Sequence, residues 1–398
     1  MTTGRERYGR LRAVMLNVAL IGISLLLAAG AAELFLRLFP SVLPQEAQLR
    51  LHWAALQNMA GPRGERMVED DDHLAFRYRP HATGTDGAGE ATFTVTTDEH
   101  GFRNPSPWPE RSELVVVGDS LALGYGVSRE ESWAGLLAAA VAPERLINLA
   151  RSGYGPPQYT RAYARLGVPL RPRVLLYSLL PANDAADAAN FERWLEAGRP
   201  TDYLVWRHTP LWSGGERGGP LSTMLSLARQ SYFATFLLGT MRQLRSPYKD
   251  QTLTLADGRR VQVTPARLAL QAAHISRDAP GFRAAMAAID EARGLAQRQG
   301  TSFLVVVMPT KEDIYLPPLG QPTPELIQPF LDEFAELGID YLDLRPVLWQ
   351  AAKDSGAALF FEVDGHPNAA GNRVIADAIL QRLREDGHLR AASRPHES

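Results

Sequence analysis

Short apolar runs alternate with helical segments along the chain from residue 114 onward. The apolar runs lie at 114–117, 146–149, 174–178, 303–307 and 341–344. Uninterrupted runs such as LVVV, VLLY and FLVVV are typical of parallel strands that are covered on both faces. Because helical segments fill the intervals between them, the pattern predicts a doubly wound α/β domain over about 111–390, followed by a short tail at 391–398.

One interval, at about 185–280, breaks this alternation. It contains an apolar helical stretch at 224–244 and the segment TLTLADGRRVQVT, in which an Asp-Gly pair separates two alternating runs and predicts a β-hairpin. Structureless loops of this length are uncommon in compact domains, so we expect an inserted cap after the third strand. Such a cap would lie at the carboxyl edge of the sheet, where α/β domains bind ligands, and could select what binds there, although ordinary packing is the alternative role for its apolar helix.

The N-terminal region has a different pattern. Residues 13–32 are almost continuously apolar, and Arg5, Arg7, Arg10 and Arg12 precede them. A helix of this length, at about 1.5 Å per residue, spans a hydrocarbon layer of roughly 30 Å. Since basic flanks stay in the cytoplasm, we predict a single-pass membrane anchor within 1–40 and the rest of the chain outside the cytoplasm. A cleaved signal peptide is the alternative, because AAGAAE offers small residues for cleavage.

Residues 41–110 lie between the predicted anchor and the predicted α/β domain. The first part is a polar stalk, and FTVT at 93–96 alternates apolar and polar residues as a half-buried strand does. We therefore expect a stalk that leads into a small β-containing leader, which packs against the main domain.

Composition excludes several classes of function. The chain has 398 residues with 45% hydrophobic and 22% charged residues, which suits a large globular core. A net charge of −2 gives no field that would attract nucleic acid, so we predict no nucleic-acid partner. The chain has no cysteine, which removes disulfides, thiolate catalysis and cysteine-based zinc sites.

The first predicted strand runs into the segment VVVGDSLALGYG, which contains Ser120. A serine between a strand and a helix lies at the carboxyl edge of the sheet, where it serves either as a helix cap or as a nucleophile. A phosphate-binding loop is not indicated, because the glycines after Ser120 lack the lysine of that motif at its spacing.

A serine nucleophile needs a base, and one of the nine histidines stands out. His366 lies in VDGHPNAAG, a loop that enters the last helix, with Asp364 two residues before it. Pro367 biases His366 away from the helical conformation. Asp364 can accept a proton from one imidazole nitrogen and leave the other free for the serine, although capping of the helix is an alternative role for both residues. No third ligand lies near them, so we predict no metal and no other cofactor.

Two further loops follow predicted strands. INLARSGYGPPQ places Gly153 after the second strand, where the absence of a side chain lets a backbone N–H approach a ligand. LLYSLLPAND places Asn183 after the third, where its amide can donate a hydrogen bond toward the sheet edge. Simple turn formation is the alternative for both residues.

Taken together, these segments resemble the SGNH, or GDSL, hydrolase superfamily, which is known by Ser, Gly, Asn and His blocks in this order. Ser120 in GDSL, Gly153 in NLARSG, Asn183 in PAND and His366 in DGHPN match the four blocks. The resemblance implies a three-layer α/β/α sandwich with a five-stranded parallel sheet. It also implies a Ser120–His366–Asp364 triad and an oxyanion hole formed by the N–H groups of Ser120 and Gly153 and the Asn183 amide.

The chain departs from the superfamily pattern at two positions. Pro181 occupies the position of the usual glycine in the third block, and the acidic residue stands two rather than three positions before the histidine. Glu362 is therefore an alternative partner for His366.

A second segment resembles the alginate-type polysaccharide O-acetyltransferases of the same superfamily. Pro309, Lys311 and Tyr315 in MPTKEDIY match their P-x-K-x-x-x-Y segment, which makes Lys311 and Tyr315 candidate substrate contacts. A strand-end loop with a solvated lysine is the alternative. In those acetyltransferases the Asp/His pair precedes the serine, whereas here it follows.

Three functions fit these observations. The first is a membrane-anchored extracytoplasmic serine esterase that hydrolyses acyl or acetyl esters of a small molecule, lipid or glycan. The second is an O-acyltransferase that uses the same triad to move an acetyl group to a cell-surface polysaccharide. The third is a binding scaffold without chemistry, which the presence of all four block residues argues against. The motifs alone do not separate the first two functions.

Overall fold

The structure is a computed structural model that describes residues 3–43, 67–87, 89–142, 145–207 and 231–389. The chain divides into two compact units, one formed by 1–59 and 211–247 and the other by 60–210 and 248–398. Each unit is described by itself below. The predicted stalk up to residue 66 and the first part of the apolar stretch 224–244 lie outside the described residues, whereas regular structure begins at Val68 rather than near Phe76.

The second unit is built on a five-stranded sheet in the order β11-β10-β7-β5-β6, with all neighbouring strands parallel. The strands are β5 (Leu114–Val117), β6 (Leu146–Asn148), β7 (Val174–Leu179), β10 (Ser302–Val307) and β11 (Tyr341–Asp343). Each corresponds to one predicted apolar run, and the residues of β5, β6 and β7 are all buried. Because the second strand lies on one side of β5 and the third on the other, the strand order reverses between β5 and β7, where such sheets bind ligands.

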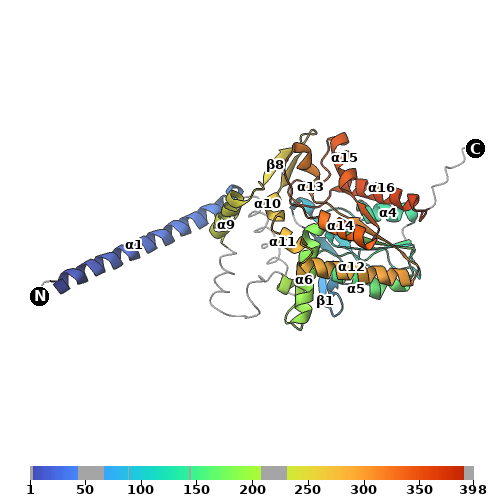
Figure 1. The fold of residues 1–398 in the computed structure, drawn as a ribbon, viewed down its shortest axis with the longest axis horizontal. Helices are drawn as coiled ribbons and strands as arrows, with labels where there is room; N and C mark the ends of the chain where they lie inside the picture. Colours follow the sequence, from blue (N-terminus) through green and yellow to red (C-terminus); the bar gives the residue numbers. More distant parts are fainter. Residues whose placement is uncertain (1–2, 44–66, 88, 143–144, 208–230, 390–398) are drawn as a thin grey trace, which may run out of the picture. The chain divides into compact units, whose positions relative to one another are not determined.

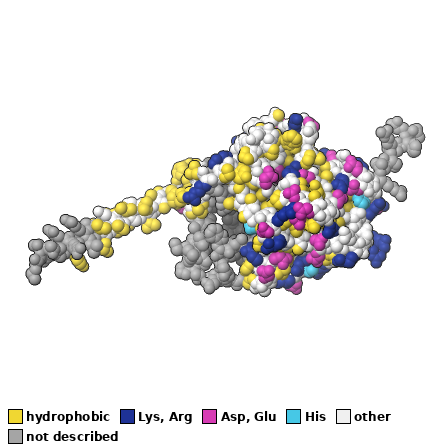
Figure 2. Space-filling view, in the orientation of Figure 1, with side chains coloured by type: hydrophobic (Ala, Val, Ile, Leu, Met, Phe, Trp, Pro, Cys, Tyr) yellow, Lys and Arg dark blue, Asp and Glu magenta, His cyan; other side chains and the backbone are white. Residues whose placement is uncertain are grey.

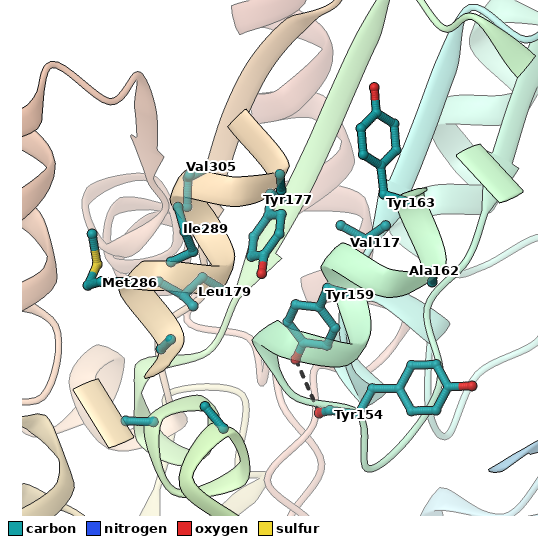
Figure 3. Close-up of a cluster of buried hydrophobic side chains, with 14 of the residues drawn as sticks. Val117, Tyr154, Tyr159, Ala162, Tyr163, Tyr177, Leu179, Met286, Ile289 and Val305 are labelled. Carbon is teal, nitrogen blue, oxygen red and sulfur yellow. Dashed lines mark hydrogen bonds between the residues drawn. The ribbon is translucent and has the colours of Figure 1, made fainter. Parts of the chain in front are cut away.

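Helices cover both faces of the sheet, which confirms the predicted α/β/α sandwich (Figure 1). One layer consists of α5 (Pro156–Ala162), α6 (Pro181–Glu196), α12 (Pro280–Arg298) and α14 (Gln328–Leu337). The other consists of α4 (Trp133–Val141), α15 (Arg345–Ser355) and α16 (Ala369–Glu385). Tyr159, Tyr177 and Ile289 belong to the core between the first layer and the sheet (Figure 3).

The segment between β7 and α12 differs from the predicted cap in where it begins. Ala185, Ala188 and Phe191 of α6 are buried in the sandwich core, so the departure from the alternation starts after Glu196 rather than at about 185. The predicted Asp-Gly hairpin is present as β8 (Gln251–Thr254) and β9 (Arg260–Val263). The described part of this segment also contains the short helices α7 (Tyr203–Arg207), α10 (Pro265–Leu268) and α11 (Ala272–Ile275).

The leader contains more strand than the sequence pattern predicts. β1 (Val68–Asp71) pairs with β2 (Ala75–Tyr78), and β3 (Thr83–Asp86) pairs with β4 (Phe93–Thr96), both antiparallel. A 3₁₀ turn at Gly89–Ala91, η3, precedes β4. Only β4 was predicted, because it alone has the clear alternation of buried and exposed residues that an amphipathic strand shows.

The first unit contains the apolar N-terminal helix α1 (Thr3–Leu38), which is longer than the predicted 13–32. Residues Val14–Leu38 are long and apolar enough to cross a membrane, and Figure 2 shows hydrophobic side chains along this helix. The described part of the unit also contains the 3₁₀ turn η1 (Pro40–Val42) and the helix α9 (Tyr232–Arg245). Leu36 and Leu43 are buried against Tyr232, Phe233 and Phe236.

Candidate active site

Ser120 follows strand β5, which lies between β7 and β6, and begins the short helix α3 (Ser120–Leu123). The cap of this helix is Asp119, whose Oδ1 accepts a hydrogen bond of 2.9 Å from the Leu121 N–H. Because Asp119 performs the capping role, the Ser120 hydroxyl is available for other contacts. The alternative role of Ser120 as the helix cap is therefore wrong.

The Ser120 hydroxyl contacts His366, although 246 positions separate the two residues. The distance between Ser120 Oγ and His366 Nε2 is 2.7 Å, and the distance between His366 Nδ1 and Asp364 Oδ1 is 2.5 Å. The same Asp364 oxygen also accepts the His366 backbone N–H at 2.9 Å. Since an ionised carboxylate only accepts hydrogen bonds, Nδ1 carries the proton and Nε2 can accept the serine proton. The three side chains form one hydrogen-bonded line.

The electrostatics of this pair favour an ionised Asp364 and a basic His366. Burial alone would lower the pKa of His366, but the negative charge and the hydrogen bond of Asp364 outweigh it and raise that pKa above 6.5. Burial alone would raise the pKa of Asp364, but the charge and hydrogen bonds of His366 hold it below its ordinary value. Each group therefore strengthens the role of the other.

A tyrosine that sequence reasoning missed packs on the imidazole. The rings of Tyr125 and His366 are stacked, with centroids 4.3 Å apart. Gly124 and Gly126, on either side of Tyr125, both have positive φ, and a Cβ at Gly126 would clash with Phe361 in the histidine loop. The Gly-Tyr-Gly pattern after Ser120 is the signal that could have drawn attention to Tyr125. Two glycines so close together indicate backbone conformations that other residues rarely adopt.

Gly153, in the loop after β6, and Asn183, in the first turn of α6 after β7, follow strands at the same edge of the sheet as Ser120. Gly153 has a φ of +84°, which favours glycine, and its carbonyl accepts a hydrogen bond from Arg207 of α7. The Asn183 amide Nδ2 lies 3.4 Å from Oδ2 of Asp119, the residue that precedes Ser120. Pro181 occupies the first position of α6, where proline is favoured, so the departure from the usual glycine is accommodated as a helix start.

Two buried aspartates near Asn183 are structural partners that the sequence did not reveal. Asp184 accepts hydrogen bonds from the Tyr159 hydroxyl and the Leu180 N–H, both at 2.7 Å. Asp187 accepts a hydrogen bond of 2.9 Å from Arg207, and burial raises its pKa to about 6 against the opposing charge of Arg207. Arg207 thereby links α6 to the Gly153 loop.

The predicted substrate contacts at Lys311 and Tyr315 are contradicted by their positions. Lys311 in α13 (Lys311–Tyr315) is 3% exposed, and its Nζ donates to the carbonyl oxygens of Glu362, Val363 and Asp364 at 2.9–3.2 Å. The Tyr315 hydroxyl accepts the Leu359 N–H at 2.8 Å. Both side chains are committed to the segment that leads to His366 and are not free to contact a substrate.

Glu362 is not an alternative partner for His366. Its carboxylate pairs with Arg260 of β9, with an Arg260 Nη2 to Glu362 Oε1 distance of 2.6 Å. Asp364 is thus the carboxylate that contacts the imidazole. In the part of the chain that the structure describes, no group of three His, Asp or Glu residues is arranged to hold a metal ion.

A parallel α/β sandwich with a GDSL serine after its first strand in the sequence, β5, and a histidine loop before its last helix has the layout of an SGNH hydrolase-like domain. Residues 269–397, about a third of the chain, match the family described as the SGNH hydrolase-like domain of the acetyltransferase AlgX. The predicted resemblance is thereby confirmed. Asp364 and His366 lie in the matched part, whereas Ser120, Gly153 and Asn183 precede it.

Several solved structures are similar over most of the chain. TesA is 15% identical and matches over 68% of this chain and 98% of its own, with a TM-score of 0.32. A lipolytic G-D-S-L family protein from Veillonella parvula is 14% identical and matches over 68% of this chain and 97% of its own, with a TM-score of 0.32. The esterase EstA from Pseudoalteromonas sp. is 14% identical and matches over 70% of this chain and 100% of its own, with a TM-score of 0.33. No curated protein matches the sequence.

Proposed function

We propose that the protein is a serine O-acyltransferase that moves an acetyl group from an ester donor to a hydroxyl of a cell-surface polysaccharide. The observation that carries this proposal is the hydrogen-bonded line Ser120–His366–Asp364. A serine hydroxyl is a weak nucleophile until a base withdraws its proton, and this line supplies a base that a carboxylate orients.

The reaction has two halves. In the first, Ser120 Oγ attacks the acetyl carbonyl while His366 Nε2 takes the serine proton, and that proton then passes to the departing alcohol of the donor. In the second, His366 takes the proton of the acceptor hydroxyl as that oxygen attacks the acetyl-serine, and it returns the proton to Ser120 Oγ as the ester bond to Ser120 breaks. Asp364 stabilises the imidazolium in both halves. The backbone N–H groups of Ser120 and Gly153 and the Asn183 amide are our candidates for oxyanion donors.

Transfer is favoured over hydrolysis by the family match. The matching family is described as an acetyltransferase, and its name supports the acetyl group as the unit transferred. Hydrolysis differs only in that water replaces the acceptor hydroxyl, so the same residues would carry an esterase activity. The predicted esterase is therefore the second outcome of the test below.

For the location, we propose an uncleaved anchor with the second unit outside the cytoplasm. The end of α1 is part of a folded unit, because the Glu33 carboxylate accepts hydrogen bonds from Ser231 Oγ and from the Tyr232 and Phe233 N–H groups at 2.8–3.1 Å. Cleavage at the small residues of AAGAAE would leave Glu33 at the new N-terminus and remove the part of α1 that precedes it. The proposed plan is an anchor within 1–40, a stalk and leader at 41–110, and the SGNH-like domain at 111–390.

The test is acetyl transfer from an activated acetyl ester by the purified full chain in detergent. We expect donor consumption to yield acetylated polysaccharide when an unacetylated bacterial polysaccharide is supplied, and no product with Ser120→Ala or His366→Ala. Donor consumption that yields only acetate, with or without polysaccharide, would support the esterase instead. Donor consumption unchanged by both substitutions would refute the serine chemistry altogether.

A further inference from the structure

The loop that carries Asp364 is held by two opposite charges from distant parts of the chain. The carboxylate of Glu90, in the 3₁₀ turn η3 of the leader, accepts the N–H groups of Glu362, Val363 and Asp364 at 3.1, 2.6 and 2.9 Å. Lys311 donates to the three carbonyl oxygens of the same residues. All six backbone polar groups of 362–364 therefore contact one of two charged side chains, and the Glu362 carbonyl also accepts the Gln262 N–H at 2.7 Å.

On the Lys311 side of the loop, the number of N–H donors equals the number of carbonyl acceptors. An ammonium has three N–H donors, and Lys311 uses one on each carbonyl. Successive backbone N–H groups that point the same way form an anion-binding concavity, and the Glu90 carboxylate occupies it. Hydrogen bonds that involve a charged group are roughly twice as strong as neutral ones. The loop backbone is thus fixed on both sides immediately before His366.

We propose that Glu90 is a positioning residue that, with Lys311, holds the Asp364 carboxylate at its distance from His366 Nδ1. The proposal rests on the proposed function and assigns the leader a part in it. Asp364 contacts the imidazole through Oδ1 alone, and that oxygen also accepts the His366 N–H, so a small shift of the 362–364 backbone moves the carboxylate off the ring. A displacement of about 1 Å in such a group can lower a rate by about a hundredfold.

The test compares Glu90→Ala with Glu130→Ala in the full-length protein. Glu130 is a suitable control because its exposed side chain pairs only with Arg129 among the described residues. Two measurements are made on each variant: hydrogen exchange of the peptide that spans 359–366, and the rate at which a fluorophosphonate labels Ser120. For Glu90→Ala we expect faster exchange in that peptide and labelling slowed by about ten- to a hundredfold. Neither quantity should change in Glu130→Ala.

A double variant distinguishes positioning from general loss of stability. If Glu90 acts through Asp364, adding Glu90→Ala to Asp364→Ala should slow labelling by less than about twofold more, because interacting residues are not additive. A full additional loss would overturn the positioning role, and so would unchanged labelling in Glu90→Ala alone. Unchanged exchange at 359–366 would overturn the contact itself. Failure of wild-type protein to label at Ser120 would instead contradict the proposed function, while the exchange measurement would still test the contact.

An independent observation concerns α9 in the first unit. One face of this helix packs on the end of α1 through Tyr232, Phe233 and Phe236, and Arg37 of α1 lies over the Tyr232 ring at 5.0 Å. The other face consists of Leu237, Leu238, Met241 and Leu244, which are 44–77% exposed among the described residues. The spacing of these four residues follows helical periodicity, so they form one apolar stripe.

The position of α9 along α1 indicates what covers this stripe. Its start is fixed to Glu33, within the last two turns of the candidate span Val14–Leu38. That span has 25 residues, about 37 Å at 1.5 Å per residue, whereas the hydrocarbon layer is about 30 Å thick. The end of α1 therefore extends to the level of the lipid headgroups. We propose that α9 lies in this interface with its apolar stripe in the lipid of the same membrane.

The absence of cysteine allows a direct test on the full chain in proteoliposomes. Single cysteines at Leu238→Cys and Met241→Cys would carry an environment-sensitive fluorophore, with Gln297→Cys on the exposed surface of α12 as the control. We expect a blue-shifted emission at both α9 sites that is quenched by spin-labelled lipids, and neither effect at Gln297→Cys. Emission that is blue-shifted but not quenched by these lipids would show that protein covers the stripe, and a water-like emission would show that nothing does. Either result overturns the proposal.

Discussion

At the scale of single residues, the pH dependence of the reaction follows from the groups around His366. Asp364 hydrogen-bonds its Nδ1, Asp119 and Lys311 act on it through their charges, and Tyr125 covers its face. Burial lowers the pKa of His366, but Asp364 raises it above the ordinary 6.5. Because the base must be neutral, we expect kcat/KM to rise with pH through a pKa above 6.5.

Asp364→Asn tests this assignment. The substitution removes the negative charge that raises the His366 pKa, so the rising limb of the pH profile should move to lower pH. The limiting rate should fall by about 10²–10⁴-fold, because the imidazole loses its orientation and the stabilisation of its charged form. The measurement is kcat/KM for acetyl ester consumption between pH 5 and 9. A limb that stays in place would show that Asp364 does not set the pKa of the base.

Asn183→Ala tests the proposed oxyanion donor. Removal of one such donor typically costs about 3–4 kcal/mol of transition-state stabilisation, which predicts a fall in kcat of about a hundredfold or more with little change in KM. The side chain lies in the first turn of α6 and makes one long contact to Asp119, so the thermal unfolding midpoint should change little. An unchanged kcat in a folded variant would remove Asn183 from the mechanism.

At the scale of elements, Lys311 links α13 to the loop before α16. Lys311→Met retains most of the apolar stem but leaves the carbonyls of 362–364 without their charged donor. A buried acceptor that loses its partner costs about 1–3 kcal/mol, so the free energy of unfolding should fall by at least this amount. The fluorophosphonate labelling rate should fall as well. Lys311→Arg retains the charge but not the compact three-donor head, and it should rescue only part of either loss.

The same element shows what the sequence pattern could and could not reveal. Apolar runs and their order predicted all five strands. A strand that is buried on both faces is apolar at nearly every position, and a short stretch of sequence is enough to show this. The sequence also singles out the P-x-K-x-x-x-Y segment. The predicted role of its Lys311 and Tyr315 is substrate contact, whereas in the structure both side chains bind the backbone before His366. Whether Lys311 points to a substrate or to three backbone carbonyls depends on a loop fifty positions away, which no local pattern encodes.

The candidate site illustrates the same limit. Ser120, His366, Gly153 and Asn183 could be selected because each follows or precedes a recognisable element at one edge of the sheet. Glu90, Tyr125 and Arg207 could not, since their importance comes only from the partner that the fold brings to them. Glu90 in particular lies in a leader for which sequence reasoning predicted only packing.

At the scale of the whole molecule, the proposed topology places the two ends of α1 on opposite sides of a membrane. Four arginines precede the apolar segment, and the basic flank should remain in the cytoplasm. The second unit would then act outside, where a cell-surface polysaccharide is accessible. A cleaved signal peptide predicts the same outward location but a soluble product that lacks the apolar part of α1 before Glu33.

The native absence of cysteine makes this topology measurable in intact cells. We expect a membrane-impermeant maleimide to label Gln297→Cys from outside and to label Thr3→Cys only after the cells are permeabilised. Because the anchor is retained, the labelled protein should sediment with membranes and keep the mass of the full chain. Recovery of Gln297→Cys as a soluble species that lacks its first thirty or so residues would favour cleavage. Labelling of Thr3→Cys in intact cells would reverse the orientation and with it the access of Ser120 to extracellular acceptors.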